Sequence, residues 1–85
     1  MAIWYINEWN QWAIGDYQNI GTTYRGIRSG VDAACPGRVG DGNWDYQSQS
    51  NWYNAGTNIQ VTCLGDTINN IHKLIPLCIV LLVNL

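Results

Sequence analysis

Charged side chains are scarce in this chain of 85 residues, which has four Lys and Arg, six Asp and Glu, and a formal net charge of −2. The charged share of 12% is about half of what soluble domains usually have. The four basic residues are too few for the long basic stripe with which proteins neutralise nucleic-acid phosphates. The composition therefore argues against a nucleic-acid-binding protein, while a hydrophobic share of 47% argues against ordinary disorder.

The usual motifs of enzymes and metal sites are also missing. There is one histidine, His72, and no Cys-x-x-Cys pair, so no zinc site is expected. No G-x-S-x-G elbow, P-loop or dinucleotide fingerprint occurs, and Glu8 with Asp16 is a carboxylate pair that no spacing singles out. A chain this short buries only about 60–65% of its unfolded surface, which leaves little room for a preorganised cleft. We expect a protein that is not an enzyme and needs no cofactor.

Phenylalanine is absent, but tryptophan and tyrosine each occur five times, and the polar residues are mostly Asn, Gln, Ser and Thr. An indole or phenol ring can cover the apolar C–H face of a sugar, while neutral amides bind its rim of hydroxyls. The composition therefore predicts a non-enzymatic, lectin-like module that binds neutral glycans. Trp4, Tyr24 and Trp44 are expected in the core. The candidate ligand-binding residues are Asn51, Trp52, Tyr53 and Asn54, with Trp9 and Trp12 as a second cluster.

Turn-forming residues interrupt the chain often and leave strand-length segments between them. The segments 2–6, 22–28, 44–50 and 57–64 are predicted strands, and Ile59, Val61 and Cys63 alternate with polar residues as in a half-buried strand. The segments 44–50 and 57–64 are predicted to pair as a hairpin that displays 51–56 at its tip. A short helix is predicted over 67–73, and the whole pattern predicts a mainly β domain, a small antiparallel sandwich or barrel with short strands and Gly-rich turns.

The chain divides into a β-rich, amide-rich and aromatic domain over 1–73 and an apolar C-terminal tail over 74–85. About ten continuous apolar residues are half of what a bilayer-spanning helix needs, and Pro76 interrupts a helix. The tail is predicted either to pack as a strand or to dock on a partner chain, and membrane contact without spanning is a third reading. Docking would make the protein a self-assembling structural subunit, such as a viral coat, tail or extracellular matrix protein.

The cysteines are odd in number: Cys35, Cys63 and Cys78. Small, thinly cored domains gain most from a disulfide, and Cys35 and Cys63 each lie beside a turn signal. The predicted bridge is therefore Cys35–Cys63, with Cys78 as a buried thiol or an intermolecular partner. Three reduced cysteines in a cytosolic or viral protein are the alternative.

Oxygen-bearing side chains alternate at Asp41, Asn43 and Asp45, as they do in calcium-binding loops. Tyr46 stands where such a loop needs glycine, and Trp52 stands where it needs the bidentate glutamate. Calcium therefore remains an alternative to the simpler interpretation of a glycine-rich turn with capping Asp side chains.

The segment 26–29 (GIRS), followed by 40–46 (GDGNWDY), resembles one repeat of the dermatopontin family over about a quarter of the chain. The resemblance implies an extracellular, β-rich matrix or agglutinin-like protein that binds glycans or matrix proteins. Gly42 replaces the arginine of that repeat and Ser48 replaces its cysteine, so the family's disulfides and glycosaminoglycan contacts do not carry over. No signal peptide is visible at the start of the chain, and we expect an extracellular or virion-associated protein.

Overall fold

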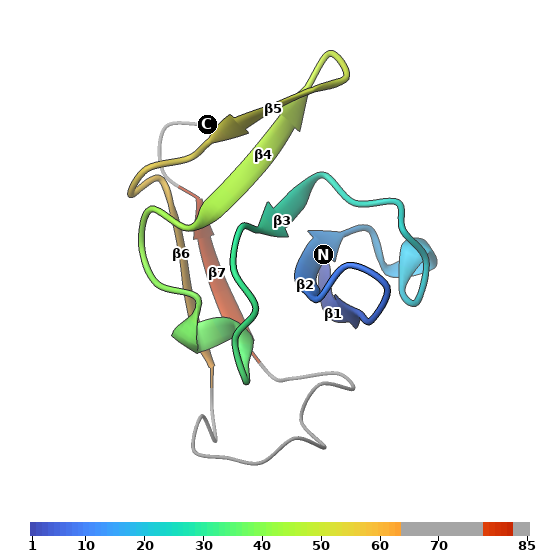
Figure 1. The fold of residues 1–85 in the computed structure, drawn as a ribbon, viewed down its shortest axis with the longest axis horizontal. Coiled ribbons are helices and arrows are strands. Elements are labelled where there is room, and N and C mark those ends of the chain that lie inside the picture. Colours follow the sequence, from blue (N-terminus) through green and yellow to red (C-terminus); the bar gives the residue numbers. More distant parts are fainter. Residues whose placement is uncertain (64–77, 83–85) are drawn as a thin grey trace.

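The computed structural model describes residues 1–63 and 78–82, and this part of the chain consists of seven short strands and two 3-10 turns (Figure 1). Strands β1 to β5 form an antiparallel sheet in chain order, and β6 and β7 form a second antiparallel sheet. The predicted mainly β, antiparallel class with short strands is confirmed. The elements are β1 (Ala2–Ile6), β2 (Gln11–Gly15), η1 (Tyr17–Asn19), β3 (Ile27–Ser29), η2 (Pro36–Arg38), β4 (Trp44–Ser48), β5 (Asn51–Asn54), β6 (Ile59–Cys63) and β7 (Cys78–Leu82).

The strand predicted over 2–6 is present, but only the end of the segment predicted over 22–28 lies in β3. The earlier part of that segment is a loop that covers the indole of Trp4, whose Nε1 donates to the carbonyl oxygen of Thr22 at 2.9 Å. Gly15 makes room for this indole, because a Cβ at this position would lie 3.2 Å from the Trp4 ring. Tertiary packing of Trp4 therefore overrides the strand preference of 22–28.

The predicted hairpin between 44–50 and 57–64 is wrong. β4 pairs instead with β5, with Ser48 opposite Asn51. The two residues between the strands, Gln49 and Ser50, have φ of 51° and 71°. Positive φ at both positions is the geometry of a two-residue hairpin turn, whose twist matches that of the flanking strands. The chain therefore reverses at residue 49, and β6 is left to pair with β7.

The main core lies between the inner face of the five-stranded sheet and the β6–β7 sheet. Its largest fully buried side chains are Trp12, Trp44, Ile14 and Ile59, each at most 1% exposed. Val61 and Val80 pack against this core from the second sheet. Ile59 and Val61 thus face inward as the alternation predicts. In Figure 1 the β6–β7 sheet lies beside β4, and the β1–β2 hairpin lies on the other side of β3.

The disulfide joins Cys63 to Cys78, so the predicted Cys35–Cys63 bridge and the assignment of Cys78 as a thiol are wrong. The reason is the register of the second sheet, in which Cys63 and Cys78 are directly opposed on neighbouring antiparallel strands. Cys35 is a buried thiol next to η2. The bridge closes a loop across 15 positions of sequence, which stabilises the fold by about 3 kcal/mol in the chain-entropy model.

Part of the C-terminal segment belongs to the fold, because Cys78–Leu82 is strand β7. Val80 faces the core, while Ile79 and Leu81 on the outer face are 68% and 53% exposed. The helix predicted over 67–73 lies outside the described residues. Among those residues, no helix has the length and apolar character needed to cross a membrane.

Candidate functional site

The outer face of the five-stranded sheet carries a row of polar side chains across three strands. Arg28 on β3 is opposite Asp45 on β4, and Asp45 is opposite Asn54 on β5. Gln47 and Trp52 form the neighbouring pair on the same face. Directly opposed residues of an antiparallel pair share a face, so these five side chains lie together on the side away from the main core.

The four candidate residues 51–54 do not converge as the sequence predicts. They form β5 instead of a loop, and successive side chains of a strand point to opposite faces. Trp52 and Asn54 share the outer face with Arg28, whereas Asn51 and Tyr53 lie on the other face. There Tyr53 packs against Tyr46, with ring centroids 5.6 Å apart.

The second predicted cluster is also divided. Trp9 lies in the turn between β1 and β2 and is 46% exposed, so it remains available to a ligand. Trp12 is fully buried and its Nε1 donates to the carbonyl oxygen of Ala33 at 2.9 Å. Trp12 is therefore a core residue, and its assignment to ligand binding is wrong. Of the residues expected in the core, Trp4 and Trp44 are buried, whereas Tyr24 is 75% exposed.

Two arginines lie between the two tryptophans that remain accessible. The guanidinium of Arg25 is 4.3 Å from the ring centroid of Trp9 and 5.0 Å from that of Trp52, and the guanidinium of Arg28 is 4.2 Å from Trp52. These four side chains and Gln11 line an open groove of about 490 Å³, which we call the Trp–Arg groove. This volume is within the range of small-molecule sites.

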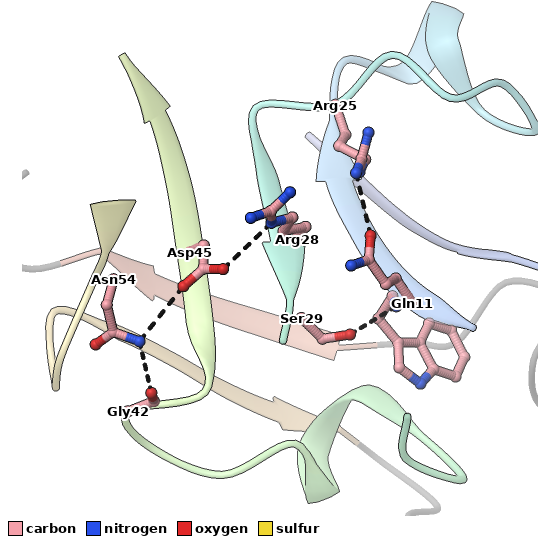
Figure 2. A network of polar contacts seen from close by, with 8 residues as sticks. Gln11, Arg25, Arg28, Ser29, Gly42, Asp45 and Asn54 are labelled. Atoms are coloured by element: carbon pink, nitrogen blue, oxygen red, sulfur yellow. Dashed lines mark hydrogen bonds and ion pairs between the residues drawn. The ribbon is translucent and has the colours of Figure 1, made fainter. Parts of the chain in front are cut away.

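Hydrogen bonds hold the arginines in place, as Figure 2 shows. Arg25 donates from Nη2 to Gln11 Oε1 at 3.1 Å and from Nη1 to the carbonyl oxygen of Thr23 at 2.9 Å. Arg28 donates from Nε to Asp45 Oδ2 at 3.2 Å. Asn54 supports this carboxylate from the other side, because its Nδ2 lies 3.4 Å from Asp45 Oδ1 and 2.8 Å from the carbonyl oxygen of Gly42.

The groove is electropositive. Its five lining side chains include two guanidiniums and no carboxylate, and Asp45 balances only one of the two charges. Burial, and then the charge of Arg28, lower the pKa of Arg25. The Nε of Arg25 is buried and has no hydrogen-bond partner among the described residues. Sequence reasoning missed both arginines because their approach to Trp9 and Trp52 is created only by the fold.

The candidate calcium loop is engaged in local contacts. Asp45 is bound to Arg28, and the Asn43 side-chain nitrogen donates to the carbonyl oxygen of Val39 at 2.8 Å. Asp41 is exposed between Gly40 and Gly42, which both have positive φ as expected for a glycine turn. Across residues 1–63 and 78–82, no three His, Cys, Asp or Glu side chains are grouped so that they could hold a metal ion.

A second hollow, of about 470 Å³, shares Arg25 with the Trp–Arg groove. Ile14, Ile27 and Tyr46 form much of its wall, and Asp16 adds a carboxylate. It has one aromatic ring and a mixed charge, so it offers less to a sugar than the groove between two indoles does.

No protein-family model, no curated protein and no solved structure matches the chain. The resemblance to a dermatopontin repeat therefore stays a prediction, and the Trp–Arg groove is the feature from which we infer a function.

Proposed function

We propose that this protein is a small, non-enzymatic glycan-binding module whose site is the Trp–Arg groove. The observation that carries the proposal is the meeting of two indoles, one from the β1–β2 turn and one from β5, at an open groove on a sheet face. Rigid aromatic side chains provide contact area for a sugar ring at a small cost in conformational entropy. Sheet strands hold most of the groove, which favours a fixed site.

The groove has the neutral polar groups that a sugar also needs. Trp9 has almost half of its surface exposed, which leaves indole surface for the C–H face of a sugar although Arg25 lies over the ring. Gln11 lines the groove, and the exposed Gln47 is paired with Trp52. Their amides would bind sugar hydroxyls. The disulfide is typical of an oxidising compartment, so we place this module outside the cytosol, on a virion or in the extracellular space.

Replacing Trp9 tests this function, because Trp9 is exposed and its loss leaves the main core intact. We expect Trp9→Ala to weaken retention on a glycan array by about tenfold, the equivalent of about 1.4 kcal/mol of lost stacking. Tyr17→Ala is the matched control, since Tyr17 is an exposed aromatic residue outside the groove, and it should bind as the wild type does. Absence of any sugar binding by the wild type, or full binding by a folded Trp9→Ala variant, would refute the proposal.

Self-assembly is a second candidate function, favoured by the outer face of β7. Ile79 and Leu81 are 68% and 53% exposed on this face. Neighbouring exposed apolar side chains are typical of subunit interfaces. A structural subunit would bury this face against another copy of the chain.

Polar replacement of this face distinguishes the two functions. If the chain assembles through β7, the wild type should be a multimer by light scattering, and the double variant Ile79→Ser/Leu81→Ser should be a monomer. Ile20→Ser is the control, because Ile20 is an exposed apolar residue on another part of the surface. A monomeric wild type at high protein concentration, or a double variant that assembles normally, would exclude this candidate.

A further inference from the structure

We propose that the Trp–Arg groove selects sugars that carry a carboxylate, which Arg25 and Arg28 bind while the indoles contact the sugar ring. This inference rests on the proposed glycan-binding function and goes beyond it by naming the acidic group of the ligand. It also replaces the expectation of a strictly neutral glycan, which came from the low overall charge of the sequence.

The distribution of charge is the first observation. Only four basic side chains occur in the chain, and two of them line one groove. The carboxylate of Asp45 contacts Arg28 through Nε, so one guanidinium charge is left without an acidic partner among the residues that line or directly support the groove. The net charge of the whole molecule is −2, so non-specific attraction of anions does not explain this local excess of positive charge.

The second observation is that hydrogen-bond donors remain available on Arg28, whose position is fixed. Among the described residues, Arg28 donates a hydrogen bond only through Nε, and its two Nη groups are left for a ligand. Both guanidiniums are held over indole rings at 4.2–5.0 Å. A planar guanidinium held in this way loses little further freedom when it binds a carboxylate with two parallel hydrogen bonds.

The third observation is that the charged form of Arg25 is disfavoured when no anionic ligand is bound. Burial and the charge of Arg28 both lower the pKa of Arg25, so the folded protein disfavours its charged form relative to water. A bound carboxylate would supply the missing opposite charge and offset both effects.

A carboxylated sugar fits better than a polysulfated glycan or a nucleic acid. Those polyanions are bound by many basic side chains in a stripe, and this chain has four in all. One carboxylate needs a single bidentate arginine, which the groove provides. Tighter binding of a sulfated glycan or of a nucleic acid would therefore contradict the inference.

The test compares a galacturonic acid trisaccharide with its methyl ester by titration calorimetry of the intact protein. The ester has the same rings and hydroxyls without the negative charges. We expect the acid to bind at least about tenfold more tightly, in line with one charge-assisted interaction. Equal binding of acid and ester would overturn this inference and leave the glycan-binding proposal standing. If the protein binds neither of these sugars and no sugar on a full glycan array, both proposals are overturned.

Substitutions of arginine test which side chain causes the preference for the acid over its methyl ester. Arg28→Gln should lower the ratio of the affinity for the acid to the affinity for the ester close to one. Arg28→Lys should keep part of this preference, because lysine keeps the charge but not the planar fork. Arg38→Gln is the control, since it removes the same charge from an exposed site outside the groove. Thermal unfolding establishes that each variant is folded. An unchanged ratio in folded Arg28→Gln, or tighter binding of a heparin-type trisaccharide or of single-stranded RNA, would overturn the inference.

Discussion

At the scale of single residues, burial separates the tryptophans that build the fold from those that face solvent. Trp4 and Trp12 are at most 2% exposed, and each donates its indole N–H to a backbone carbonyl. A buried indole needs such an acceptor, which phenylalanine would not. Trp9 is exposed instead, and the guanidinium of Arg25 lies over its ring. The same residue type thus serves two purposes, and composition alone does not assign them.

Ser29 is a polar residue on which the core depends. It is fully buried on β3, and its Oγ accepts a hydrogen bond of 2.8 Å from the backbone N–H of Trp12. Ser29→Ala would leave this buried N–H without its acceptor, so we expect a loss of about 1–3 kcal/mol in the free energy of unfolding, measured by urea denaturation. Ser48→Ala, at an exposed position of β4, should change it by less than about 0.5 kcal/mol. Equal effects of the two substitutions would show that the Ser29 hydrogen bond contributes nothing.

At the scale of elements, the sequence predicts those strands whose residues alternate between apolar and polar. The alternation of Ile59 and Val61 with polar neighbours predicts β6 and its inward face, both of which are present. The turn of Gln49 and Ser50 could not be predicted in this way, because neither residue is glycine and yet both have positive φ. Because of that turn, residues 51–54 form a strand. Successive side chains of a strand point to opposite faces of the sheet, so Trp52 and Tyr53 lie on opposite faces.

The candidate site shows the same division between local and long-range information. Trp9 and Trp52 are recognisable in the sequence as candidate sugar-stacking residues. The contacts of Arg25 with Trp9 and Trp52 join segments that are distant in sequence, and they depend on the strand order of the sheet. Without a family pattern to connect those segments, no spacing rule predicts the groove.

At the scale of the whole molecule, one covalent bond joins the two strands of the second sheet, which covers the core. Cys63 lies on β6 and Cys78 on β7, and Ile59, Val61 and Val80 of the same strands pack on the main core. A two-stranded sheet is marginal in water by itself, so it depends on this packing and on the bridge. A small domain with a thin core gains much from such a link.

We therefore expect Cys63→Ser and Cys78→Ser each to lower the free energy of unfolding by about 3 kcal/mol in urea without reductant. The double variant should lose about as much as either single variant, because each substitution removes the same bridge. Cys35→Ala is the control: after alkylation under denaturing conditions, mass spectrometry should detect one modified thiol in the wild type and none in this variant. A Cys35→Ala variant with modified thiols would show that Cys35 takes part in the bridge, and additive losses in the double variant would show that the two serine substitutions act through separate interactions.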